Sequence, residues 1–351
     1  MTSDPLPSVA PADDRGRFGP AAAIGTLIGI VVTVACLLGG VWVLTHQQRI
    51  IDQVAVWQYQ PNAAITGYAD RAELTDEGRF LLYASRPKVL PDDKFDRGCA
   101  AVDEGFGVLG CYLPSERQIY LYDVTDERLD GLEEVVATHE MLHAAWDRMT
   151  RDERDALGPL LEAEAAELAG DETFAATMEF YAEHEPGQRL NELHSILGTE
   201  VADLSPALEA HYAQYLGNRA AIVALHEQSS AVFREQQARV QALVAEIEAL
   251  VAGIEADSAA YTSGYATLNA DIAAFNARAD RGDFASQSQF DAERNEILAR
   301  EADLDALYAS IEQRDAQYDQ LALDLEALNL EIDGLNASIN IDPPQIPEPN
   351  G

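Results

Sequence analysis

The chain has 351 residues, 47% of them apolar, so it is long enough for two domains and can build a packed core. Its 61 acidic residues outnumber its 23 basic residues and give a formal net charge of −38. A surface this negative repels phosphate backbones, which excludes nucleic acid as an expected partner.

The N-terminal region divides into a polar tail and an apolar run. Residues 1–20 are rich in Pro, Ala, Ser and Asp without an apolar period, which predicts a disordered tail. Residues 21–45 carry no charge and are long enough to cross a bilayer. We expect a transmembrane helix there, because the run exceeds a signal-peptide core and no small-residue cleavage site follows it. Cys36 is interpreted as an inert membrane thiol, since apolar residues continue beyond it.

Charge and cysteine positions predict the orientation of the chain. Arg15 and Arg17 precede the apolar run and Arg49 alone follows closely, which favours a cytoplasmic N-terminus. Cys99 and Cys111 bracket a Gly-rich segment, and such a pair in an exported domain predicts a disulfide. The alternative is a cytoplasmic domain with reduced cysteines.

A helix close to the membrane and then short strands are predicted between Arg49 and Leu129. One of these strands is expected at residues 80–83. Residues 107–112 and 118–124 flank Pro114-Ser115-Glu116-Arg117, which predicts a β-hairpin.

Residues 135–146 carry the pattern H-E-x-x-H in an apolar, helix-compatible run. His139 and His143 are four residues apart, so on a helix they lie on one face and can share a metal ion. Glu140 follows the first histidine and can accept a proton from water that the metal activates. The alternative is a chance match on a core helix, which a chain with only 7 histidines disfavours. We therefore expect one zinc ion (Zn2+) per chain.

Catalytic zinc usually takes three protein ligands, so one more is needed. Glu192 lies in a helix expected to begin after Glu185-Pro186-Gly187, and we predict that it is the third ligand. Glu179, Glu183 and His184 are the alternatives for this role. Glu192 would then be a solvated residue in a first helical turn.

The two motifs, H-E-x-x-H at 139–143 and N-E-x-x-S at 191–195, resemble those of the gluzincin metallopeptidases, of which thermolysin is the familiar member. The resemblance covers residues 139–195. It implies that both histidines and Glu192 bind zinc and that Glu140 is the general base.

Two further points follow from the resemblance. In gluzincins an edge strand before the motif helix binds the substrate backbone by strand addition, a role expected here for residues 118–124. The family pattern also follows its serine with an aspartate that orients a zinc-binding histidine. Ile196 stands at that position here, so another residue must orient the histidine.

Several helices are predicted around and beyond the motif. Thr150-Arg151-Asp152-Glu153 is a capping box that predicts a helix start, and another helix is expected from Glu172 to about Glu183. Ser205-Pro206 predicts the start of a helix that carries His211, Tyr212 and Tyr215. A zinc peptidase needs a donor for the tetrahedral oxyanion, and His211 and Tyr212 are the candidates. The alternative is an ordinary helix face.

Residues 218–339 are rich in Ala, Leu, Ile, Glu, Asp, Gln and Arg and contain almost no proline. Apolar residues step by three and four in two runs, which predicts a coiled-coil register. Residues 281–288 break helicity between the runs. We therefore expect two antiparallel helices with Val232 near Leu335, followed by an extended Pro-rich tail at 340–351.

The sequence thus predicts an α+β, mostly helical chain. Its expected parts are a single transmembrane helix (21–45), a small zincin-like metallopeptidase domain (49–216) and a long antiparallel coiled-coil hairpin (218–339). The expected function is a membrane-anchored, extracytoplasmic zinc peptidase that hydrolyses a peptide or protein substrate. The alternative is a non-enzymatic, membrane-anchored envelope scaffold whose coiled coil binds a helical partner.

Overall fold

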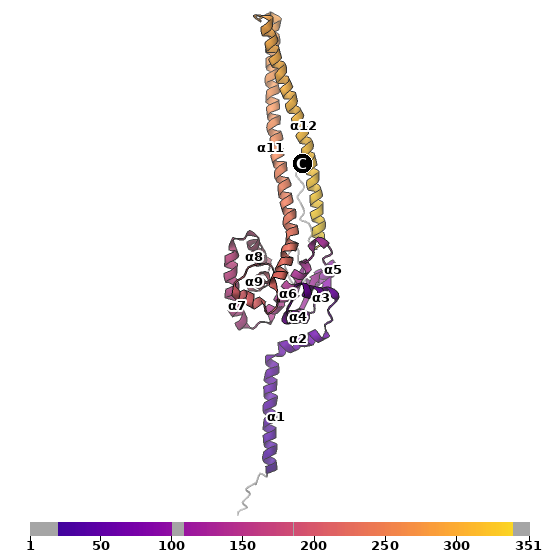
Figure 1. Cartoon of the computed structure of the whole chain (residues 1–351), viewed down its shortest axis with the longest axis vertical. Coiled ribbons are helices and arrows are strands. Elements are labelled where there is room, and N and C mark those ends of the chain that lie inside the picture. Colours follow the sequence, from indigo (N-terminus) through magenta and orange to yellow (C-terminus); the bar gives the residue numbers. More distant parts are fainter. Residues whose placement is uncertain (1–19, 100–108, 185, 340–351) are drawn as a thin grey trace, which may run out of the picture. The chain divides into compact units, whose positions relative to one another are not determined.

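A computed structural model describes residues 20–99, 109–184 and 186–339 (Figure 1). The described residues are mostly helical and include one three-stranded sheet. The chain divides into two compact units, Met1–Gln60 and Pro61–Gly351, and each is described by itself. The tails predicted at 1–20 and 340–351 lie outside the described residues except for Pro20, as do residues 100–108 between the two cysteines.

The first unit contains two helices, α1 (Pro20–Thr45) and α2 (Gln47–Gln58). α1 covers the uncharged apolar run, and α2 is the helix expected next to it. Among the described helices, with α1 counted from Val31, none alone is long and apolar enough to cross a bilayer. Val31–Thr45 and α2 together satisfy both criteria, and the two helices are bent by 70° relative to each other.

The sheet of the second unit has the strand order β1-β3-β2. Its strands are β1 (Lys88–Leu90), β2 (Gly110–Leu113) and β3 (Gln118–Tyr122). β2 and β3 pair antiparallel around the predicted turn, so the hairpin is confirmed. β1 pairs parallel with the other side of β3. The expected edge-strand role of residues 118–124 is therefore wrong for β3, because a strand about thirty residues earlier occupies its second edge.

The strand predicted at residues 80–83 is also wrong, because these residues are helical. They belong to α4 (Asp76–Ala84), which follows α3 (Ala63–Arg71). The Thr75 hydroxyl caps α4 by accepting a hydrogen bond from the Gly78 N–H at 3.1 Å. Leu81 and Leu82 are buried together with Gly78 at helical spacing. The apolar run is thus one face of a short capped helix.

The predicted disulfide joins α5 (Asp92–Cys99) to β2. Cys99 and Cys111 are bonded to each other and are both buried. They pack with Phe95, Leu113 and Tyr122 in a small apolar cluster beside the sheet. Closing a loop of this size contributes about 2–4 kcal/mol, chiefly by restricting the unfolded chain.

The helices after the sheet begin and end close to the predicted signals. They are η1 (Glu127–Leu129), α6 (Leu132–Arg148), α7 (Arg151–Glu167), η2 (Leu168–Gly170), α8 (Glu172–His184), α9 (Arg189–Thr199) and α10 (Pro206–Tyr212). The capping box at Thr150 and Glu153 is confirmed, with both reciprocal hydrogen bonds present. Tyr215, expected within the last of these helices, lies beyond its end.

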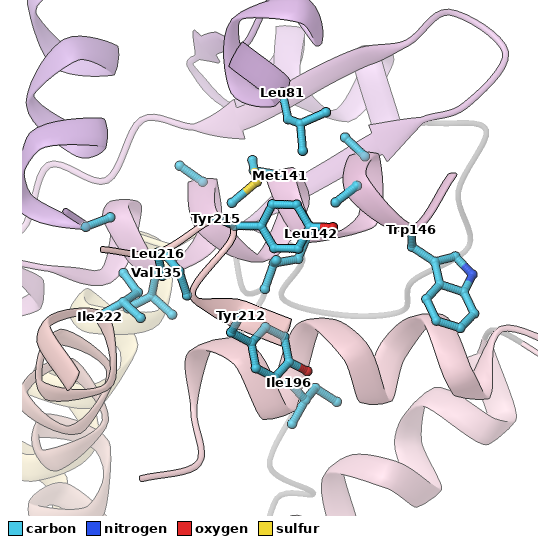
Figure 2. Packing of buried hydrophobic residues seen from close by; sticks show 14 of the residues in the cluster. Leu81, Val135, Met141, Leu142, Trp146, Ile196, Tyr212, Tyr215, Leu216 and Ile222 are labelled. Atoms are coloured by element: carbon cyan, nitrogen blue, oxygen red, sulfur yellow. The ribbon is translucent and has the colours of Figure 1, made fainter. Parts of the chain in front are cut away.

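The core of the second unit forms around α6, which packs against the sheet, α4 and α9. Figure 2 shows Met141 and Leu142 of α6 among side chains from the surrounding elements, including Ile196 and Tyr212. All four side chains are at most 1% exposed. Their burial holds α6 in place on several sides, and α6 carries the H-E-x-x-H motif.

The long hairpin consists of α11 (Arg219–Arg281) and α12 (Gln287–Ala337), which lie side by side (Figure 1). Gly282 ends α11 with a φ of 67°, a left-handed conformation that glycine adopts without strain. Ion pairs join the two helices along their length, including Arg314–Asp257 and Arg278–Glu293. The antiparallel arrangement is therefore confirmed, and 63 residues give α11 a length of about 95 Å at 1.5 Å per residue.

The base of the hairpin packs on the domain that carries the motif. Leu129 of η1, Leu335 and Ile339 form a buried cluster, against which Val232 and Phe233 also pack. The predicted proximity of Val232 and Leu335 is therefore confirmed. Through this cluster, the C-terminal end of α12 packs against η1, which directly precedes α6 in the chain.

Candidate metal centre

Helix α6 brings the three motif residues together. Glu133 and Glu134 favour its first turn through the helix dipole, and Arg148 favours its last turn. His139 and His143 project from one face one turn apart, with ring centroids separated by 4.7 Å. The rest of the helix is largely buried, so this pair of rings is held by the packing of the whole helix.

Helix α9 supplies the third group, Glu192. The turn before α9 includes Gly187, whose φ is 95°, and the helix then runs alongside α6. The Glu192 Oε2 atom lies 3.8 Å from Nε2 of His139 and 3.6 Å from Nε2 of His143. Glu192 is 1% exposed. Because one carboxylate oxygen faces both imidazoles, the three residues converge on a single point.

These three residues fit a metal ion. Their ligand atoms all lie within 4.8 Å of one another. A tetrahedral ion with bonds of about 2.0–2.2 Å holds its ligand atoms roughly 3.3–3.6 Å apart, so small side-chain rotations complete the geometry. Two imidazoles and one carboxylate are also a donor set that divalent transition metals accept. The group at His139, His143 and Glu192 could therefore hold a metal ion.

Ser195 supports the ring of His143 from the side away from Glu192. Its Oγ atom lies 3.2 Å from Nδ1 of His143, and the serine is fully buried. When Nδ1–H donates to this oxygen, Nε2 keeps its lone pair and points toward Glu192. Ile196, which follows Ser195, is buried in the apolar core and contributes no such contact.

Burial and nearby carboxylates shift the pKa values of the two histidines in opposite directions. Burial lowers the pKa of His139, but the nearby carboxylates of Glu192, Glu140 and Glu200 outweigh it and raise the pKa to about 9. Burial dominates at His143 and lowers its pKa. A metal ion must displace the proton of His139, so metal affinity increases with pH.

Glu140 lies next to the ligands on α6 and is 5% exposed. Gly110 of strand β2 packs directly against the Glu140 side chain. A Cβ at that position would lie 2.5 Å from Val136 Cγ1 and 2.9 Å from Glu140 Cγ, closer than real contacts allow. Gly110 therefore leaves room for the Glu140 side chain. Sequence reasoning missed this residue, because only the fold brings β2 onto α6.

The alternative third ligands lie elsewhere, on α8. Glu179 and Glu183 are exposed. The His184 ring contacts the Phe180 carbonyl through Nδ1 at 2.8 Å and stacks on the Phe180 ring. Among these candidates, the structure brings only Glu192 to the two motif histidines.

His211 and Tyr212 lie against His194 on another side of α9. The fully buried Tyr212 hydroxyl donates to the His194 carbonyl at 2.8 Å. His211 Nε2 lies 2.9 Å from His194 Nε2, and its ring also lines a cavity of about 280 Å³ beside Leu157 and Tyr215. The oxyanion-donor role predicted for His211 and Tyr212 gains no support from this arrangement, because Nε2 of His211 and the Tyr212 hydroxyl both contact His194.

Comparisons of the chain with protein-family models, with curated proteins and with solved structures gave no match.

Proposed function

We propose that the protein is a zinc-dependent peptidase that is anchored in a membrane and acts outside the cytoplasm. The convergence of His139, His143 and Glu192 within 4.8 Å, with Glu140 beside them on the same helix, is the observation that carries this proposal. Two imidazoles and one carboxylate are a typical protein donor set of catalytic zinc, which keeps a further position open. A purely structural zinc site would fill all four positions with protein ligands and would have no use for Glu140.

The residues of the site have distinct roles in this proposal. A bound zinc ion supplies Lewis-acid activation of water and of a peptide carbonyl. Glu140 accepts the proton that the attacking water loses and later delivers it to the amine of the leaving peptide. Ser195 keeps the ring of His143 in orientation. The buried surroundings of α6 strengthen the electrostatic interactions of these groups.

Zinc content of the purified full-length chain tests the metal centre. The wild type should hold about one zinc per chain, and His139→Ala or His143→Ala should remove it, because each deletes a ligand. His184→Ala is the matched control, since this histidine lies on α8 and should leave zinc content unchanged. Zinc retained in both ligand variants would refute the proposed centre.

Glu140→Gln separates metal binding from chemistry. The substitution keeps the shape of the side chain and removes the base, so zinc should remain while hydrolysis of a peptide library falls by about 100-fold or more. Activity equal to that of the wild type would exclude Glu140 as the general base.

A second function, as an envelope scaffold, is favoured by one feature of the hairpin. Leu323 and Leu330 are seven residues apart on α12 and are 59% and 65% exposed. An apolar pair at heptad spacing is a contact that a third helix in a coiled coil can use. The phenotype of Glu140→Gln decides between the two functions, because a scaffold does not need a general base.

The proposed membrane anchorage rests on α1, and the proposed exported orientation rests on the disulfide. α1 carries no charged residue along its 26 residues, and a disulfide is stable in an exported domain. In intact cells, a membrane-impermeant thiol reagent should label Cys99 and Cys111 only after reduction. Labelling of both thiols without reductant, or only after cell lysis, would count against the exported orientation.

A further inference from the structure

Residues at several positions along the face of α9 that meets α6 approach the two motif histidines. Glu192 faces Nε2 of both rings, and Ser195 reaches Nδ1 of His143. Two turns beyond Glu192, at the C-terminal end of α9, Glu200 approaches the ring of His139. Its Oε1 atom lies 4.0 Å from Nδ1 of His139. Each histidine thus has one nitrogen toward Glu192 and the other toward a second polar residue, Ser195 within α9 or Glu200 directly after it.

Glu200 also faces the hairpin. Its other carboxylate oxygen, Oε2, lies 4.0 Å from Nε2 of His226 on α11. Ser230 Oγ, one turn further along α11, lies 3.3 Å from the same nitrogen. The carboxylate therefore stands between an imidazole of the candidate metal centre and an imidazole of the hairpin.

Arg219, the first residue of α11, fixes this end of α9 to the hairpin. Arg219 is 7% exposed, and its guanidinium donates to the carbonyl of Leu197 at 3.3 Å and to that of Ala202 at 2.6 Å. It also donates to the Val201 carbonyl and pairs with Glu209. These carbonyls flank Glu200 in the chain, so α11 holds the backbone from which Glu200 projects.

We propose that Glu200 is a positioning residue for the metal ligand His139 and that the hairpin helix α11 holds Glu200 in place through His226 and Arg219. This inference rests on the proposed zinc centre. A carboxylate that accepts from Nδ1–H of a ligand histidine fixes the orientation of its ring and makes Nε2 a stronger donor to the metal. The closure from 4.0 Å to hydrogen-bonding distance is a small side-chain rotation at a residue that is 27% exposed. The base of the hairpin is thus part of the metal centre.

Zinc affinity of the full-length chain, measured by competition with a chelator, tests the role of Glu200. Glu200→Gln keeps the size of the side chain and removes its charge, and it should weaken zinc binding by about 10- to 100-fold. Glu227→Gln is the matched control, because it removes the same charge from an exposed position on α11. Its zinc affinity should stay within about twofold of the wild type, since an exposed and solvated charge acts weakly.

Cobalt substitution provides a readout that a general loss of stability would not move. The visible absorption bands of the cobalt-loaded chain report the geometry of its ligands. They should shift in Glu200→Gln, because the ring of His139 loses its orienting contact, and should stay unchanged in Glu227→Gln. An unshifted spectrum together with wild-type zinc affinity in Glu200→Gln would overturn the positioning role.

Two variants of His226 test the contribution of the hairpin. His226→Ala should weaken zinc binding in the same direction as Glu200→Gln, whereas His226→Gln should restore it, since an amide N–H can replace the Nε2 donor. Wild-type affinity in His226→Ala would overturn the hairpin contribution. His139→Ala distinguishes the two proposals: zinc retained there refutes the metal centre itself, whereas zinc lost there but bound normally by Glu200→Gln refutes only the positioning role.

Discussion

Gly198 sets the approach of α9 to α6, and an added methyl group there should disturb both stability and metal binding. A Cβ at this position would lie 2.5 Å from Leu142 Cδ1 and 2.8 Å from Tyr212 Cε1. Both neighbours are fully buried, so neither can swing into solvent. Carbon atoms in contact normally lie about 3.5–4.0 Å apart, so Gly198→Ala must displace α9 or its neighbours by about 1 Å.

The expected magnitude combines two opposing terms. Overpacking a close-packed core costs about 1–3 kcal/mol. Replacing glycine by alanine within a helix returns about 1 kcal/mol, which leaves a net loss of up to about 2 kcal/mol in the free energy of unfolding. A shift of about 1 Å also carries Glu192 away from His143, whose present separation is 3.6 Å, and out of the range that a tetrahedral ion spans. Zinc affinity should therefore fall by at least about 10-fold.

Urea denaturation followed by circular dichroism measures the first effect, and chelator competition measures the second. Gly67→Ala is the matched control, because Gly67 also lies inside a helix, α3, but a Cβ there meets no atom within 4 Å. It should raise the free energy of unfolding by about 0.5–1 kcal/mol and leave zinc affinity unchanged. If Gly198→Ala matched this control in both measurements, the close approach of α9 would not position Glu192.

Three further outcomes are expected. Oxidation of a Val232→Cys, Leu335→Cys double variant should give an intramolecular crosslink, visible on a denaturing gel as a faster-migrating monomer, and exclusively intermolecular products would contradict the hairpin. Thr150→Ala should lower the free energy of unfolding by about 1 kcal/mol through loss of the α7 capping box; an unchanged urea midpoint would contradict this. Hydrogen bonding to Arg71 lowers the pKa of Asp130, so this pair stabilises the fold above about pH 4 and loses its effect as the pH falls through the lowered value. Arg71→Gln should therefore reduce the loss of stability between pH 7 and pH 3 in urea titrations, and an unchanged difference would contradict the pairing.

Features that depend on residues close in the chain could be predicted from the sequence. The H-E-x-x-H spacing requires only a helix to bring His139 and His143 together, and α6 is that helix. The capping box at Thr150 and the turn at 114–117 are likewise short-range patterns with a defined geometry. The hairpin of α11 and α12 also follows from local periodicity, because one break between two long apolar registers leaves the second helix to fold back on the first.

Residues 80–83 show where local pattern was insufficient. Four apolar and aromatic residues in a row fit a buried strand as well as one face of a helix, and the cap at Thr75 decides for the helix. The central position of β3 in the sheet could not be predicted from local sequence either. The hairpin with β2 is local, but the pairing of β1 with the other edge of β3 joins residues about thirty positions apart.

The candidate metal centre divides in the same way. The sequence by itself determined the two histidines, Glu140 and the helix on which they lie, because a spacing of four residues on a helix is a geometric statement. Only the tertiary structure decided that Glu192, rather than an acidic residue of α8, faces the histidines, since this depends on how α9 packs against α6. The tertiary structure alone also brings Glu200 between His139 and His226, because three helices from separate parts of the chain meet there. Packing between such distant segments leaves no local periodicity in the sequence.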